Sequence, residues 1–182
     1  MHHKTWCSAK LKEEIAIVRI NPETGQFLDI HLFEKGLRFK CKRCATYCCK
    51  LGGPCLTKED IEQIESSGHK TNEFVADSGR KYGNYPMTSE MRNRKDGSCI
   101  FLRTDKKRNT YECSIYEIRP VLCRLFPFEI KGIDISSFLL KILPCNGLND
   151  ADGELVNERF VAKHLLEKNH KHLLKLTELV QP

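Results

Sequence analysis

The 182-residue chain is predicted to be a single-domain α+β protein, and three observations lead to that prediction. Short apolar runs separated by turn residues predict an N-terminal β-hairpin in residues 15–33. Ten cysteines, five of them within residues 41–55, indicate an irregular metal-binding middle. Apolar side chains at helical spacing in residues 154–179 predict a long C-terminal amphipathic helix. We therefore expect a hairpin region at 1–38, a metal-binding domain at 39–150 and a packed helix at 151–182.

The hairpin and the first helix rest on local signals. Residues 15–20 are mostly apolar and β-branched, residues 21–25 (Asn-Pro-Glu-Thr-Gly) are typical of a turn, and residues 27–33 return as the second strand. Thr57 has the character of a helix N-cap, because acidic side chains follow it in the first turn. Gly68 is the expected end of that helix.

Shorter elements are expected farther along the chain. Proline suits the first position of a helix, so a short helical turn beginning near Pro120 should carry Cys123. Apolar and β-branched runs predict strands, and a polar loop is expected at residues 105–109. The remaining predicted elements are a short helix at 72–76 and strands at 87–91, 99–102 and 133–143.

The sequence favours a reducing, cytoplasmic location. The N-terminal residues lack the apolar segment of a signal peptide, and apolar runs such as that at 138–140 are far too short to span a bilayer. In a reducing compartment thiols stay free unless a metal holds them, so metal ligation is favoured over disulfides. The net charge of +6 comes from interspersed signs, which argues against a nucleic-acid groove, and no membrane partner is expected.

The spacing of the cysteines predicts a metal bound by thiolates. Cys41 and Cys44 form a CxxC pair, and a tight turn there can bring two sulfurs to one ion. The adjacent side chains of Cys48 and Cys49 should diverge, by about 100° in a helix, so they would serve two sites, two metals of one cluster, or one site and the core. All-thiolate sites suit zinc or an iron–sulfur cluster, and spacing alone does not choose between them.

Longer motifs carry a family resemblance. Gly-Ser-Cys-Ile-Phe-Leu at 97–102 and Cys-Ser-Ile-Tyr-Glu-Ile-Arg-Pro-Val-Leu-Cys-Arg-Leu-Phe-Pro at 113–127 resemble the YkgJ-like cysteine-cluster family of zinc- or iron-chelating proteins. Pro-Cys-Asn-Gly at 144–147 is similar to a later family element, so the resemblance covers about residues 39–150. Three residues separate Cys44 from Cys48, where the family usually has two. The resemblance implies eight metal ligands, namely Cys41, Cys44, Cys48, Cys49, Cys99, Cys113, Cys123 and Cys145, whereas Cys7 and Cys55 match no family motif.

The resemblance implies a metal ion or cluster as the partner and much less about activity. The leading interpretation is a structural or electron-carrying centre with no assigned reaction or protein partner. The alternative is a cluster-dependent protein-modifying enzyme related to flagellin lysine N-methylase, although the sequence lacks a Gly-rich nucleotide loop. Within the second motif we expect Arg119 to bind backbone carbonyls and offset thiolate charge, with Tyr116 packed beneath it.

Overall fold

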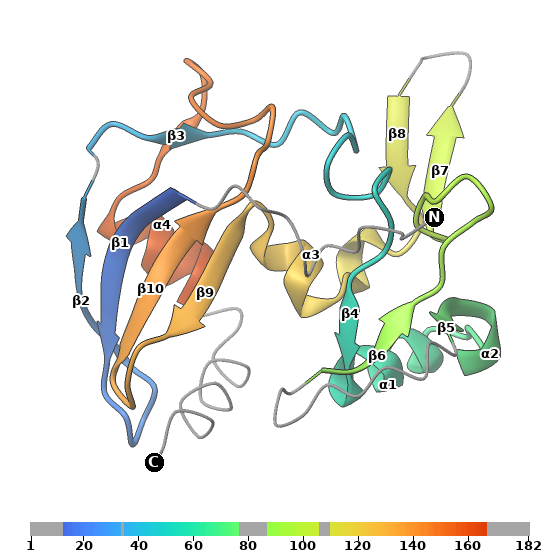
Figure 1. The fold of residues 1–182 in the computed structure, drawn as a ribbon, viewed down its shortest axis with the longest axis horizontal. Coiled ribbons are helices and arrows are strands. Elements are labelled where there is room, and N and C mark those ends of the chain that lie inside the picture. Colours follow the sequence, from blue (N-terminus) through green and yellow to red (C-terminus); the bar gives the residue numbers. More distant parts are fainter. Residues whose placement is uncertain (1–12, 34, 77–86, 106–109, 167–182) are drawn as a thin grey trace. The chain divides into compact units, whose positions relative to one another are not determined.

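The computed structural model describes residues 13–33, 35–76, 87–105 and 110–166. Contacts divide the chain into two compact units. We call Lys42–Phe126 the cysteine unit, and residues 13–41 together with 127–166 the sheet unit. The mixture of helices and strands confirms the predicted α+β class (Figure 1). No helix in the described ranges combines the length and the apolar character that crossing a bilayer requires.

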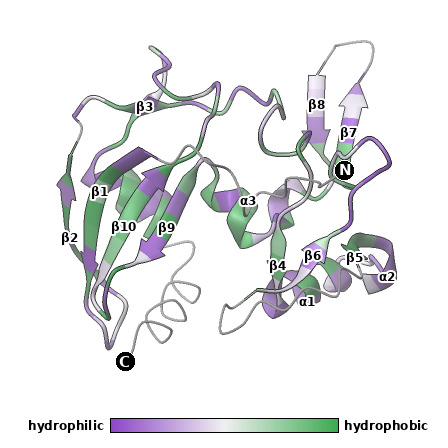
Figure 2. Ribbon diagram, in the orientation of Figure 1, coloured by the Kyte–Doolittle hydropathy of each residue, from purple (hydrophilic) through white to green (hydrophobic). Residues whose placement is uncertain are grey.

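The sheet unit is built on a four-stranded antiparallel sheet in the order β2-β1-β10-β9 (Figure 1). Alternate residues of β1, among them Ala16 and Val18, are almost fully buried, as expected for one face of a strand. Their partners on β10, Leu140 and Phe138, bury the same face. Hydrophobic colour accordingly follows much of β1 in Figure 2. The strands are β1 Glu13–Ile20, β2 Phe27–Leu32, β9 Phe128–Gly132 and β10 Ser137–Ile142, which confirms the predicted hairpin.

The predicted long C-terminal helix is wrong at its start. Glu154–Leu155 forms strand β11 and pairs with β3 (Arg38–Phe39), so backbone pairing across the chain overrides the helical pattern there. Helix begins only after Asn157, whose side chain accepts a hydrogen bond from the Phe160 N–H at 3.0 Å. The described residues contain a short α4 (Glu158–Phe160) and a π-helical segment (Val161–Leu166), and the rest of the prediction falls at 167–182, outside the described residues.

The cysteine unit contains a three-stranded sheet in the order β4-β6-β5 and a separate hairpin of β7 and β8. The helix predicted after Thr57 is confirmed, and its N-terminus is a capping box. The Thr57 hydroxyl accepts from the Asp60 N–H, and the Asp60 carboxylate accepts from the Thr57 N–H, both at 3.0 Å. The elements are β4 Cys55–Thr57, α1 Lys58–Ser66, α2 Thr71–Phe74, β5 Val75–Ala76, β6 Met87–Met91, β7 Leu102–Asp105, β8 Thr110–Cys113, a 3₁₀ turn at Tyr116–Ile118 and α3 Val121–Leu125.

The strand predicted at 99–102 is also wrong, because the chain turns there. The Leu102 N–H donates to the Cys99 carbonyl at 3.0 Å, and only Leu102 of this run belongs to β7. The turn is buried in a hydrophobic core, with Cys99 itself as a member and Cys48, Cys49 and Cys113 packed against it. Other core members are Ala45, Leu56, Ile64, Phe74, Met91, Phe101, Leu102 and Ile115.

Candidate metal centre

Five thiols gather around the core of the cysteine unit. Cys48 and Cys49 lie on the loop before β4, Cys99 lies on the turn before β7, Cys113 ends β8, and Cys123 lies on α3. Burial raises the pKa of Cys123, and the charges of Cys99, Cys113 and Cys48 raise it further. Each of the five thiols acts electrostatically on others of the set. The structure therefore brings these five predicted ligands within electrostatic range of one another.

The loop that carries Cys48 and Cys49 is joined to the turn that carries Cys99. Ala45 has a φ of 55°, in the left-handed region, and its carbonyl accepts from the N–H groups of Cys49 at 3.3 Å and Lys50 at 2.8 Å. The Cys49 carbonyl in turn accepts from the Cys99 N–H at 2.8 Å. This backbone bond fixes two predicted ligands against each other although they are far apart in sequence.

The β7–β8 hairpin brings the next ligand to the same turn. Leu102 is the register partner of Cys113, at the base of the hairpin. The Ser114 N–H donates to the Phe101 carbonyl at 3.0 Å, which continues the pairing beyond β8. Cys99 and Cys113 therefore lie at the same end of the hairpin.

Backbone N–H groups are directed at several of the sulfurs. The Phe101 N–H lowers the pKa of Cys99, and the Ile115 N–H lowers that of Cys113, although burial outweighs both and raises the Cys99 pKa to about 11. In the sheet unit the Gly147 N–H donates to the Cys145 sulfur at 3.4 Å. In all three cases the donor is two residues after the cysteine. Such donors stabilise a thiolate, which is the form that binds metal.

Arg119 supplies positive charge to the group. Its guanidinium lowers the pKa of Cys48, Cys113 and Cys123. Its Nε donates to the Tyr116 carbonyl at 2.9 Å, and the guanidinium lies 3.7 Å from the centroid of the Tyr116 ring. The expected backbone bond of Arg119 and its packing on Tyr116 are confirmed, and its positive charge favours the thiolate forms of the neighbouring cysteines.

Cys48 and Cys49 do not diverge as expected. Their thiols form a hydrogen bond, because the irregular turn after Ala45 is neither extended strand nor regular helix. This bond is the largest influence on both groups: it lowers the pKa of Cys48 to about 7 and raises that of Cys49 well above its ordinary value. One thiolate of the pair thus forms readily, and the second forms only when a cation replaces its proton.

In the metal-free, reduced protein, we expect Cys48 to be the first of these thiols to be alkylated near neutral pH. The reactive thiolate dominates above its pKa of about 7 and disappears below it. An ordinary cysteine reaches the same point only near pH ~8.5. Iodoacetamide labelling at a series of pH values, followed by peptide mass spectrometry, measures the midpoint, with exposed Cys41 as the accessibility reference. A fast phase that survives Cys48→Ser would contradict the assignment.

The other three predicted ligands are not among the five gathered thiols. Cys44 is half-buried in the cysteine unit, and Cys41 and Cys145 belong to the sheet unit. There the Lys40 N–H donates to the Gly147 carbonyl at 2.9 Å, so the segments that carry Cys41 and Cys145 are paired. A Cβ on Gly147 would lie 2.2 Å from the Lys40 oxygen, which explains the glycine.

The two remaining cysteines are not among the predicted ligands. Cys55 is buried in β4, and Cys7 lies outside the described residues. As the side chains stand across the described ranges, no three Cys, His, Asp or Glu groups are arranged to hold a metal ion. The donor set itself fits zinc or iron, since soft thiolates predominate and backbone N–H groups and Arg119 support their anionic form.

Asp60 is a residue whose role the sequence did not reveal. Besides its part in the capping box, its Oδ1 accepts from the Val121 N–H at 2.9 Å, at the start of the helix that carries Cys123. Asp60 is buried, with 4% of its surface exposed. The acidic residue three positions after Thr57 signals a capping box, but its bond to residue 121 depends on tertiary packing.

Comparisons with known proteins identify the family of the chain. A family model described as "CxxCxxCC: Putative zinc- or iron-chelating domain" matches residues 40–149, a range that includes all eight predicted ligands. An uncharacterized protein of Methanocaldococcus jannaschii is 30% identical over 147 residues, covering 77% of this chain and 73% of that protein. No solved structure matches the chain significantly.

Proposed function

The chain belongs to the CxxCxxCC family of zinc- or iron-chelating domains, and from that premise we propose that it holds a thiolate-bound metal centre with a structural or electron-carrying role. We propose the eight family-motif cysteines as ligands: Cys41, Cys44, Cys48, Cys49, Cys99, Cys113, Cys123 and Cys145. Five thiols in one unit exceed the four ligands of a single tetrahedral ion, which favours more than one ion or a cluster.

The gathering of thiols with N–H donors on their sulfurs is the observation that carries this proposal. Several free thiolates in one buried group would repel each other, and burial would oppose their charge. A bound cation removes both penalties, because it replaces the protons and neutralises the thiolates.

The metal content and the colour of the purified protein distinguish zinc from an iron–sulfur cluster. We expect protein purified without oxygen to carry at least one equivalent of zinc or iron per chain. A brown protein with acid-labile sulfide would identify an iron–sulfur cluster, whereas a colourless protein with tightly held zinc would identify zinc. Elemental analysis combined with sulfide assay makes the measurement. A chain that carries neither metal, and takes up neither after reduction, would contradict the proposal.

The methylase-like alternative gains no support from these observations. The family description names metal chelation only, and the archaeal relative has no described activity. We therefore propose no reaction.

A further inference from the structure

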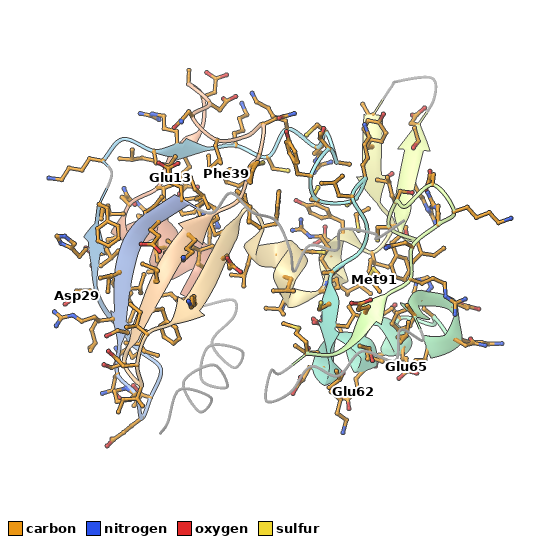
Figure 3. All side chains as sticks on the ribbon, viewed as in Figure 1. Glu13, Asp29, Phe39, Glu62, Glu65 and Met91 are labelled. Carbon is orange, nitrogen blue, oxygen red and sulfur yellow. The ribbon has the colours of Figure 1, made fainter. Side chains whose placement is uncertain are left out.

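A methionine sulfur lies against one of the predicted metal ligands. The Cys99 Sγ and the Met91 Sδ are 3.2 Å apart. Both residues are buried in the core of the cysteine unit, with 5% and 3% of their surfaces exposed (Met91 is labelled in Figure 3). Met91 ends β6, and the thioether is therefore a fixed neighbour of the thiol group rather than a surface side chain.

The surroundings hold Met91 in this position. Its N–H donates to the Pro54 carbonyl at 2.9 Å. A Cβ placed on Gly53 would lie 2.6 Å from the Met91 Cβ, so the backbone of the cysteine-bearing loop approaches the methionine as closely as a glycine permits. Gly53 is itself fixed, because its N–H donates to the Asn93 Oδ1 at 2.7 Å.

The two sulfurs are close enough to share an ion after a small movement. Metal–sulfur bonds are about 2.3 Å long, so two sulfurs on one ion stand roughly 3.8–4.0 Å apart at tetrahedral or trigonal angles. Backbone geometry joins two further cysteines to the turn that carries Cys99. The Cys49 carbonyl accepts from the Cys99 N–H at 2.8 Å, and Cys113 is the register partner of Leu102. Either thiolate is a candidate for the third ligand.

The chemistry of the Met91 thioether limits which metal ions it can bind. It carries no charge and is a soft donor, and the usual ligands of zinc are thiolate, imidazole and carboxylate. Soft thiolate and thioether ligands suit Cu(I), zinc and iron–sulfur clusters. Because iron–sulfur clusters are held by thiolates and zinc does not usually take a thioether, Cu(I) is the ion of this group that a methionine ligand favours. Building on the proposed thiolate centre, we propose that Met91 and Cys99 provide a mixed thioether–thiolate site for Cu(I), completed by a neighbouring thiolate.

A methionine-to-leucine exchange tests this site. Cu(I) affinity is measured on the reduced full-length chain by competition with a chromophoric Cu(I) chelator, and Zn(II) affinity is measured in parallel. Met91→Leu keeps the volume and removes the sulfur, and it should weaken Cu(I) binding about 10–100-fold while changing Zn(II) affinity less than about twofold. The control is Met87→Leu, at the other end of β6 and also buried, which should change neither affinity.

Each other result overturns the site. Unchanged Cu(I) affinity in Met91→Leu, or an equal loss of Cu(I) and Zn(II) affinity, would make Met91 a packing residue. Zinc or iron binding without any Cu(I) binding would overturn this site and leave the proposed function intact, whereas binding of none of these metals would overturn both. X-ray absorption of the Cu(I)-loaded selenomethionine protein gives an independent measurement, because a copper–selenium distance of bonding length requires a methionine ligand and its absence rejects one.

Discussion

Cys123→Ala is expected to release most of the bound metal and to lower the free energy of unfolding of the loaded protein by about 5 kcal/mol or more, because metal binding in such sites is coupled to folding. Cys123 lies on α3, where burial and three neighbouring thiols raise its pKa. It is therefore a group that a cation must deprotonate and hold. Elemental analysis and urea unfolding of the loaded protein measure the two effects, and Cys113→Ala should behave in the same way.

Cys55→Ala is the matched control for this experiment. Cys55 is another cysteine of the cysteine unit, and it is buried in β4 and matches no metal motif. We expect the variant to keep its metal and to lose about 1–2 kcal/mol of stability through lost packing. Metal loss from Cys55→Ala together with metal retention in Cys123→Ala would invert the assignment of ligands.

The second large effect is expected from Asp60→Ala, with a loss of about 3 kcal/mol or more in the free energy of unfolding. The buried carboxylate accepts hydrogen bonds from the N–H groups of Thr57 and Val121. Hydrogen bonds to a charged group contribute about 1.5–3 kcal/mol each, and both donors would be left buried without their acceptor. Chemical denaturation of the loaded protein measures the change.

Two variants in the same helix turn show how much of the loss in Asp60→Ala comes from the helix cap and how much from the bond to Val121. Glu59→Ala removes an exposed acidic residue from the first turn and should cost no more than about 1 kcal/mol. Thr57→Ala removes only the cap and should cost about 1 kcal/mol. If Asp60→Ala cost no more than Thr57→Ala, the bond to Val121 would contribute nothing to stability.

Local signals in the sequence predicted the elements that depend on neighbouring residues. The hairpin of β1 and β2 follows from apolar strands around an Asn-Pro-Glu-Thr-Gly turn, and α1 follows from the N-cap at Thr57 and the acidic first turn after it. The predictions are wrong where contacts with distant segments of the chain determine the local structure. Glu154–Leu155 pairs with Arg38–Phe39, and the turn at Cys99 is held by the loop that carries Cys49. Neither partner can be identified from periodicity.

In the candidate site, too, the sequence predicted some features and tertiary contacts determine the others. Cysteine spacing and the motifs at 97–102 and 113–127 identified the five thiols that gather in the cysteine unit. The loop that carries Cys48 and Cys49 begins at Ala45 in a left-handed conformation, which is uncommon for a non-glycine residue and is not indicated by the sequence. Met91 and Asp60 reach the site from elements that carry no cysteine motif, so only the tertiary structure reveals them.

The pairing of β1 with β10 also sets an order of events during synthesis. β1 and β2 alone make a two-stranded hairpin, which is only marginally stable in water. The partner strand β10 follows β1 by roughly 120 residues, a delay of about 6–24 s at ribosomal rates of ~5–20 residues per second. Residues 42–126 are translated within that interval. The five gathered thiols, from Cys48 to Cys123, are therefore synthesised before β10, so metal can reach them before the sheet closes, whereas Cys145 is added only afterwards.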